Sequence, residues 1–303
     1  SLAGLDWQLR RSDLFGDKSI EAYAWAIESH NDGIGHGSAY GGRIFYDNFG
    51  PWFAAGTRRV DEAFLPALGF IEESGADEAD VGLGWKHRLA QGGSLLAAVY
   101  AGQRDRHDGT EQSDKIGPFI EYTTPQGDVV GAEGYSERDT LAAPFELLPG
   151  VVVPAGRSGW RQASVYAIAS GSRALSGEAS LRRGGLYSGH LNGESLSLTW
   201  RPNLHWAFGT ATSRQDLRID GARFIARTHT LRLDHAGSTR SAQSLVLQRD
   251  NVSRQNTFGV RARWTLAPGR ELIAALDRAR PLAAERAALR TLASLKLVWN
   301  WER

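Results

Sequence analysis

Histidine, serine and acidic residues are the first candidates for chemistry in this chain, which contains 8 His and no Cys. Two short motifs bring possible partners close together, Asp234-His235 and Ser188-Gly189-His190. Adjacent side chains of a strand point to opposite faces, which argues against a catalytic dyad. The Gly-x-Ser-x-Gly motif of serine hydrolases does not occur. We therefore expect no catalytic residues and no enzymatic activity.

An acidic run around Gly75 is the strongest candidate for metal binding. Calcium takes six to eight oxygen ligands, and such a run can supply some of them. The spacing of an EF-hand is missing, and without Cys there can be no thiolate zinc site and no disulfide. We expect a solvated loop, with no metal and no cofactor. The run consists of Glu72, Glu73, Asp77, Glu78 and Asp80.

The charge balance argues against nucleic acid as a partner. The 303 residues include 35 Lys and Arg against 34 Asp and Glu, a formal net charge of +1. Nucleic-acid binding depends on an excess of basic groups that releases counterions. No run of about 18 apolar residues is present either, so the sequence predicts no transmembrane helix.

Long stretches of period-two alternation dominate the chain and predict strands with one apolar and one polar face. Val81, Leu83 and Trp85, for example, alternate with Gly82, Gly84 and Lys86. Similar apolar sets occur throughout: Leu5, Trp7, Leu9; Tyr23, Trp25, Ile27; Leu196, Leu198, Trp200; Phe258, Val260, Ala262, Trp264; Leu295, Leu297, Trp299, Trp301.

The length of these strands favours an antiparallel transmembrane β-barrel over a soluble sandwich. Many reach ten residues or more, and about 9–11 residues cross a bilayer at a tilt. In such a barrel the apolar side chains face lipid and the polar ones face the lumen. The charged residues that we expect to line a pore are Asp6, Arg10, Glu28, Lys86, Glu178, Arg182, Arg261, Arg263, Lys296 and Glu302. Opposite charges could equally pair across strands and only solvate the wall.

Turn signals divide the connections into two kinds. Tight turns are predicted at Phe15-Gly16-Asp17, Asn48 to Pro51, Gln91-Gly92-Gly93, Pro125 to Asp128, Gly171-Ser172, Pro202-Asn203, Ala236-Gly237-Ser238 and Pro268-Gly269. Longer loops are expected near 30–38, 61–76, 105–114, 141–157, 214–222, 249–256 and 278–290. Short turns on one rim and long loops on the other are typical of outer-membrane barrels.

Tryptophan residues near the tight turns or the C-terminus predict an aromatic girdle at one membrane interface. These residues are Trp52, Trp85, Trp200, Trp206, Trp264, Trp299 and Trp301.

The alternating segments predict a single domain, residues 1–303, with about 16–18 strands. Our count is about 17, an odd number, and the first tight turn makes the first strand descend from outside. We therefore expect at least one upstream strand to be missing from this chain, or the count to be wrong by one. The segments are 3–14, 18–29, 39–48, 52–60, 76–88, 93–105, 115–124, 128–139, 158–170, 174–187, 192–202, 204–215, 222–235, 239–249, 255–266, 270–278 and 290–302.

Several motifs, in order along most of the chain, resemble a known family. Leu2-Ala3-Gly4-Leu5-Asp6 is similar to its first strand, and Phe64 to Ile71 to its Phe-Asn-Pro-x-x-Gly-Phe-Val loop, with Leu65 replacing Asn. Pro144-Phe145-Glu146, Val153 to Gly156, Leu198 to Pro202, Gln248 to Ser253 and Arg261 to Trp264 resemble its later segments. The family is the bacterial outer-membrane domain-of-unknown-function family 5916, whose C-terminal β-barrel usually follows a carbohydrate-binding module similar to family nine. The resemblance implies a fold and an absent module, and no catalytic residues.

Two segments depart from the alternation. Residues 141–157 are too apolar for a solvated loop, and we expect them to fold over or into the barrel mouth as a constriction, or to pack against a partner or the absent domain. The constriction candidates are Pro144, Phe145, Leu148 and Val152. Leu282 to Leu292 is rich in Ala and predicts a short helix.

The leading functional hypothesis is a pore or translocation component of the Gram-negative outer membrane, embedded in the lipid bilayer. The module linked to the family suggests an oligosaccharide or another small solute. A second polypeptide could supply the missing strands or a periplasmic module. Two alternatives stay open: a sealed barrel that anchors or scaffolds a surface complex, and a soluble all-β carbohydrate-binding protein.

Overall fold

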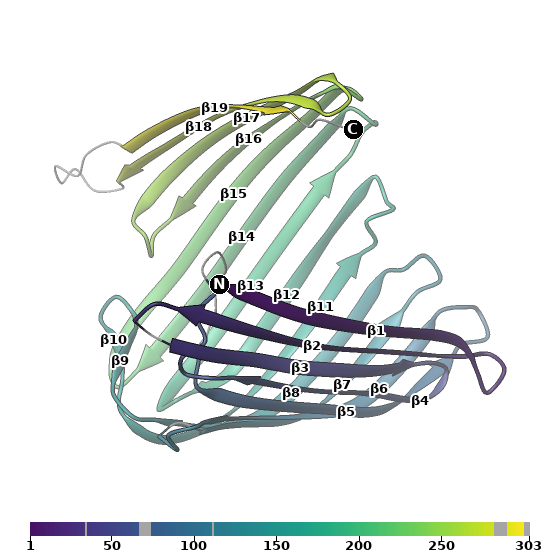
Figure 1. Ribbon diagram of the computed structural model, residues 1–303, viewed down its shortest axis with the longest axis vertical. Coiled ribbons are helices and arrows are strands. Elements are labelled where there is room, and N and C mark those ends of the chain that lie inside the picture. The colour runs from purple at the N-terminus through teal and green to yellow at the C-terminus, as the bar shows by residue number, and fades with distance from the viewer. Residues whose placement is uncertain (34, 67–73, 111, 282–289, 300–303) are drawn as a thin grey trace.

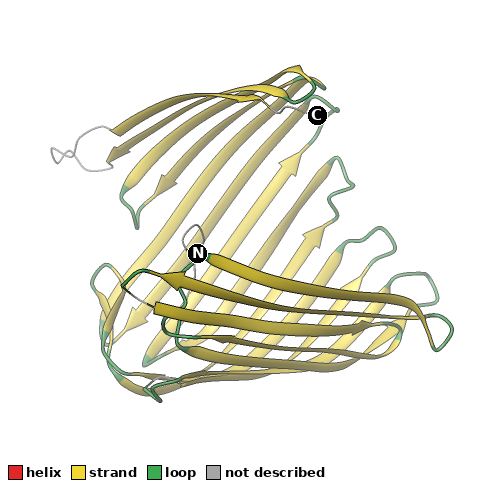
Figure 2. Cartoon of the chain, viewed as in Figure 1, coloured by secondary structure: helices red, strands yellow, loops and turns green. Residues whose placement is uncertain are grey.

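The computed structural model describes residues 1–33, 35–66, 74–110, 112–281 and 290–299, and it is an all-β structure (Figure 2). The strands are β1 (Leu2–Leu14), β2 (Lys18–Asn31), β3 (Gly35–Asp47), β4 (Gly50–Val60), β5 (Ala76–Arg88), β6 (Ser94–Arg106), β7 (Gln112–Thr123), β8 (Val129–Leu141), β9 (Phe145–Leu148), β10 (Val151–Val153), β11 (Gly156–Ala169), β12 (Leu175–Leu186), β13 (Gly189–Trp200), β14 (Trp206–Ile219), β15 (Ala222–Ser238), β16 (Ser241–Asp250), β17 (Gln255–Ala267), β18 (Arg270–Pro281) and β19 (Arg290–Trp299).

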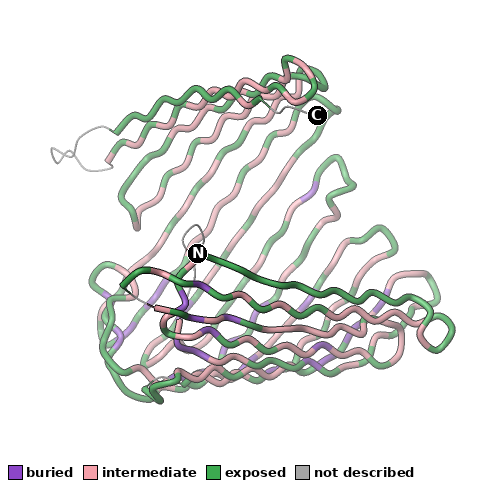
Figure 3. The backbone as a smooth tube through the Cα atoms, in the orientation of Figure 1, coloured by how far each residue is buried: buried purple, intermediate pink, exposed green. Residues whose placement is uncertain are grey.

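All strands except β9 and β10 form one antiparallel sheet of 17 strands, which confirms the predicted strand number. Each strand pairs with its neighbours in sequence, and β8 pairs with β11 across the small β9–β10 hairpin. The sheet bends so that its first and last strands lie at separate edges (Figure 1). In the described part of the chain β1 and β19 do not pair with each other, and β1 is exposed along almost its whole length (Figure 3).

Cross-strand register assigns every side chain to one of two faces, since directly paired residues share a face. Trp85 pairs with Ala97, Ala97 with Ile120, and Ile120 with Ala132, so these four belong together. This apolar face continues through all strands of the sheet, and its large side chains are exposed, Leu5 at 82%, Leu83 at 62% and Leu295 at 73%. The opposite face, here called the polar face, carries most of the charged residues.

The register contradicts the prediction for β2. Tyr23, Trp25 and Ile27 lie on the polar face, while Ala22, Ala24 and Ala26 share the apolar face with Leu9, Trp7 and Leu5. Ile27 and Trp25 pack against the buried cluster of Ala39, Val60 and Phe64, which explains the inversion. Glu28 therefore lies on the apolar face and not on the polar face where we expected it.

One rim of the sheet has the predicted tight turns, except that the turn expected at Ala236-Gly237-Ser238 lies at 239–240, and the other rim is less regular than expected. Residues 187–188 and 220–221 are two-residue connections, and β14 continues to Ile219, so the expected loop at 214–222 is wrong. Asp220 and Gly221 both have positive φ, 47° and 81°, which is the geometry of a type I′ hairpin turn. The long connections on this rim are 61–75 and 142–155. The predicted helix at 282–292 lies largely outside the described residues, and Arg290 to Leu292 belong to β19.

Candidate functional site

A group of polar and aromatic side chains lies on the polar face of β6, β7, β8 and β11, and we call it the ring-carboxylate cluster: Tyr100, Lys115, Glu133, Tyr135, Glu137 and Gln162. Lys115 Nζ lies 3.7 Å from the ring centroid of Tyr135 and 5.5 Å from that of Tyr100. Tyr135 donates its hydroxyl hydrogen to Gln162 Oε1 at 2.5 Å, and Gln162 Nε2 donates to the carbonyl of Gly185 at 2.8 Å. These contacts fix the orientation of both side chains of the Tyr135–Gln162 pair.

Carboxylates surround the rings of this cluster. Ser164 Oγ donates to Glu133 at 2.8 Å, and Tyr166 donates to Glu121 at 3.1 Å. Glu137 is directly opposite Lys115 in the β7–β8 register. Gly131 leaves room for the ring of Tyr166, since a Cβ there would lie 2.2 Å from the ring. Local glycines thus allow large rings to lie flat on a crowded sheet face.

The cluster and its surroundings retain unused hydrogen-bonding capacity. Tyr100 Oη, Trp160 Nε1 and Asp139 Oδ1 are buried and have no hydrogen-bond partner among the described residues. Buried polar groups are nearly always paired, so water or a polar solute would satisfy these atoms. Rings, carboxylates and an amide together can hold a molecule that has both an apolar face and many hydroxyl groups.

Ion pairs cover the same face on the neighbouring strands β3, β4 and β5. Arg43 pairs with Asp80 at 2.6 Å, Arg58 with Glu78 at 2.6 Å, and Lys86 with Asp47 at 2.7 Å. All of these side chains are partly exposed, so each pair stabilises the fold only slightly. Positive and negative charges therefore alternate on this part of the polar face, and they produce no large net electrostatic field.

The β9–β10 hairpin packs against the polar face at the rim of β14 and β15. Val151 and Val153 are buried against Ile219, with Leu141 and Phe224 around them. Ile219, Leu141 and Phe224 all lie on the polar face by register. Part of the predicted segment 141–157 therefore packs on the polar face at this rim, as a hairpin that the sequence did not predict.

Aromatic contacts join this hairpin to the cluster side of the sheet. Tyr187 lies 6.0 Å from the ring of Phe145 and 4.7 Å from that of Trp160, centroid to centroid. Its hydroxyl donates to Asp139 Oδ2 at 3.2 Å. Burial raises the pKa of Tyr187 to about 12, so the hydroxyl stays protonated and remains a donor at neutral pH.

A second segment folds inward at the same rim, between β4 and β5. Phe64 is buried against Ala39 and Val60, and Ser29 Oγ accepts a hydrogen bond from the backbone N–H of Leu65 at 3.1 Å. A Cβ at Gly37 would lie 2.2 Å from the backbone nitrogen of Phe64, so only glycine allows this close approach. Residues 67–73 of the same connection lie outside the described residues.

Most of the expected pore-lining residues share the polar face. Eight do so by register: Asp6, Arg10, Lys86, Glu178, Arg182, Arg261, Arg263 and Lys296. Glu28 does not, and Glu302 lies outside the described residues. Among the constriction candidates, Leu148 contacts the hairpin core, whereas Phe145 and Val152 are 37% and 52% exposed. Pro144 is exposed and precedes β9.

Sequence reasoning missed the aromatic part of the cluster. Tyr100 and Tyr135 occupy positions of their strands where polar residues were expected, between Val99 and Ala101 and between Gly134 and Ser136. The sequence feature that could have identified these two tyrosines is a large aromatic ring at a position where the alternation predicts a polar residue.

The residues considered for catalysis or metal binding form ion pairs and hydrogen bonds with other residues of the sheet. Asp234 pairs with Arg232 on the polar face, whereas His235 contacts Gln243 on the apolar face. Ser188, in a turn, donates to Asp220. Asp77, Glu78 and Asp80 pair with Arg59, Arg58 and Arg43, while Glu72 and Glu73 lie outside the described residues. Within the described ranges no group of three or more potential ligands could hold a metal ion.

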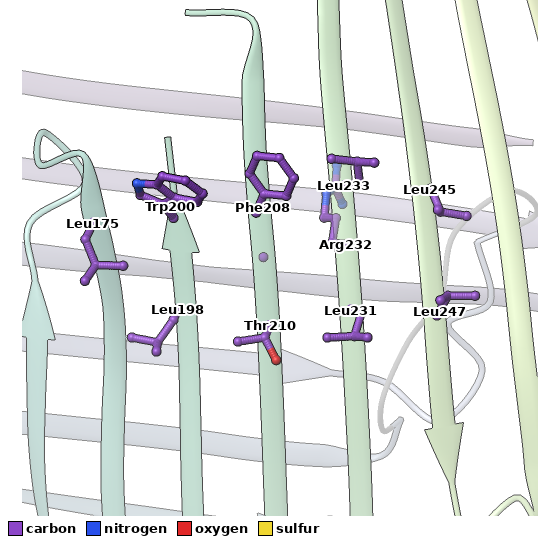
Figure 4. Close-up of a pocket in the computed structure, with 11 residues that line it drawn as sticks. Leu175, Leu198, Trp200, Phe208, Thr210, Leu231, Arg232, Leu233, Leu245 and Leu247 are labelled. Carbon is purple, nitrogen blue, oxygen red and sulfur yellow. The ribbon is translucent and has the colours of Figure 1, made fainter. Parts of the chain in front are cut away.

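The apolar face has its own depression over β12 to β16 (Figure 4). Leucines and aromatic rings of adjacent strands form rows here, including Leu198, Phe208, Leu231 and Leu247. Trp85, Trp200, Trp206, Trp264 and Trp299 lie on this face near the tight-turn rim. Trp52 does not, because it lies on the polar face over Gly82, and Trp301 is outside the described residues.

The comparisons with known proteins identify no family. The chain matches no protein-family model, and no curated protein matches it. No helix that could cross a membrane occurs in the part of the chain that the structure describes.

Proposed function

We propose that this chain forms most of the wall of an outer-membrane β-barrel, with its apolar face toward lipid and its polar face along a path for a polar solute. The observation that carries the proposal is the single uninterrupted apolar face of the 17-stranded sheet. A soluble protein rarely exposes a contiguous apolar surface of this extent. A bilayer covers such a face at no cost in unpaired polar groups.

The aromatic residues support the same orientation. Five of the expected tryptophans lie on the apolar face at one rim, where indole rings suit the boundary between acyl chains and headgroups. Short turns connect the strands at that rim. Turns of this kind are typical of the periplasmic side of outer-membrane barrels.

The solute class follows from the ring-carboxylate cluster. Lys115 lies over the rings of Tyr100 and Tyr135, and carboxylates and buried unpaired polar atoms lie beside them. Sugars combine hydroxyl groups with apolar C–H surfaces, so an oligosaccharide suits this surface. The resemblance to a family linked to a carbohydrate-binding module agrees with that choice.

A complete barrel requires further strands. An odd number of antiparallel strands leaves β1 and β19 running in the same direction, so antiparallel closure needs an odd number of additional strands. In lipid each unpaired backbone group of an open edge costs several kcal/mol. We propose that another part of a longer chain or a second polypeptide covers both edges.

Single-channel recording in planar bilayers tests the proposal. We expect discrete conductance steps, blocked partly by an oligosaccharide, and a larger conductance after deletion of residues 143–153, because the inward hairpin occupies the rim. Tyr135→Ala should weaken the block without abolishing the steps. Absence of conductance from both the full chain and the deletion variant would contradict a pore and favour a sealed anchor, which the two inward-folding segments would also suit.

A further inference from the structure

The apolar face ends in an arginine-rich row at the loop rim of β12 to β16. We call Arg183, Arg214, Arg218, Arg223, Arg227 and Arg249 the arginine belt. Register places all of them on the apolar face. Arg183 is two residues from Leu181, and Arg249 two residues from Leu247, about 7 Å along each strand. The belt therefore borders the exposed leucines directly.

Like charges are placed opposite each other within this belt. Arg214 is directly opposite Arg227, and Arg218 is directly opposite Arg223, in the β14–β15 register. Directly opposed like charges on a sheet are destabilising unless an opposite charge compensates them. The acidic residues of this face in β12 to β16 are Glu194 and Asp216 alone.

Asp216 compensates only part of the charge. It pairs with Arg223 at 2.5 Å, with Arg214 at 3.6 Å and with Arg218 at 3.8 Å, and its side chain is only 8% exposed. Glu194 adds one contact with Arg214 at 3.6 Å. Arg183, Arg227 and Arg249 are exposed and form no ion pair with any described residue. The belt thus keeps a surplus of positive charge beside an apolar surface.

We propose that the arginine belt binds the phosphate groups of anionic lipid headgroups, in the leaflet at the loop rim. The apolar side chains below the belt contact the acyl chains of the same lipid, and the guanidinium groups form charge-assisted hydrogen bonds with its phosphate oxygens. A free anion would use only the second contact. The inference rests on the proposed membrane orientation of the apolar face.

The test uses the full chain in a neutral detergent, titrated with short-chain phosphatidate and followed by native mass spectrometry. Short-chain phosphatidylcholine and inorganic phosphate serve as comparison ligands. The variant is Arg227→Gln with Arg249→Gln. Neither side chain forms an ion pair with a described residue, so the substitutions leave no acidic group there without its partner. The matched control is Arg201→Gln with Arg240→Gln, which removes the same charge from two tight turns at the opposite rim.

We expect the wild-type protein and the control to retain phosphatidate in preference to phosphatidylcholine, and the belt variant to lose about tenfold in that preference. Equal retention by all three proteins, or equal loss in the variant and the control, would overturn the proposal. Displacement of phosphatidate by equimolar inorganic phosphate would also overturn it, in favour of a free-anion site.

Circular dichroism of the variants confirms the fold. Insertion into phosphatidylcholine vesicles tests the proposed function separately, since it needs the apolar face and not the belt.

Discussion

The β4–β5 pair and the β13–β14 pair distribute charge differently. On the polar face of β4 and β5, Arg58, Glu78, Asp80 and Lys86 form ion pairs and Arg88 lies over the ring of Phe49, while Arg59 and Asp77 pair on the apolar face. In contrast, β13 and β14 carry no charged residue on that face, which is lined by small side chains such as Ser195, Ser197, Ala211 and Ser213. Their charges lie on the apolar face, within or next to the arginine belt.

This difference shows that one sheet can have two kinds of wall. The β4–β5 wall is filled by its own paired side chains, and a glycine such as Gly84 lies against its neighbour Ala98. The small side chains of the β13–β14 wall leave space, which the β9–β10 hairpin covers at the rim. The first wall is filled by paired charges, whereas the second supports an added segment.

We expect the largest effect from a substitution that detaches the β9–β10 hairpin from β14. Val153→Asp places a charge where the native side chain is fully buried against Ile219, and we expect the hairpin to detach at a cost of about 3 kcal/mol or more. Limited proteolysis within 142–155 measures the release. Val152→Asp is the control, because Val152 is 52% exposed. Equal protease resistance of both variants would show that the packing does not hold the hairpin.

Crowding on the β4–β5 wall predicts a second, smaller effect. A Cβ at Gly84 would lie 2.4 Å from the Cβ of Ala98, while a Cβ at Gly193 on β13 would lie 3.6 Å from its nearest neighbour. Gly84→Val should therefore lower the free energy of unfolding by about 1–3 kcal/mol, and Gly193→Val by much less. Urea unfolding in detergent compares them. A larger loss at Gly193 would reverse the distinction between the walls.

The sequence predicted the strand number and the faces of most strands, because strict alternation such as that of Val81 to Lys86 is set by the period of the backbone itself. It failed where two large residues are adjacent or where small residues occupy the apolar face. Trp52 and Phe53 cannot be assigned without the register to Gly84 and Leu83, and the row of Ala22, Ala24 and Ala26 hides the apolar face of β2. The ring-carboxylate cluster unites four strands, so its composition depends on register that no local pattern contains.

A smaller effect is expected at the tight-turn rim, where Asp128 links two neighbouring turns. Its carboxylate pairs with Arg173 and accepts the backbone N–H of Ser170 at 2.8 Å, and these contacts lower the pKa of Asp128 to about 2. A lowered folded-state pKa means that the stabilisation is full above the unfolded value of about 4 and is lost as pH falls toward 2. Asp128→Asn should flatten this part of the pH profile of thermal unfolding, with the larger loss of stability at neutral pH, where the native carboxylate is ionised, and little change near pH 2. An unchanged profile would contradict the role of the carboxylate.

The most direct test of the account is the accessibility of two adjacent residues of β13, and the native chain, which has no Cys, permits it without background labelling. Ser197→Cys places a thiol on the polar face and Leu198→Cys on the apolar face. In protein reconstituted into vesicles, a water-soluble maleimide should label the first and spare the second, whereas a lipid-soluble quencher should reach a fluorophore at the second alone. Equal labelling at both positions, or the reverse order, would contradict the assignment of the apolar face to lipid.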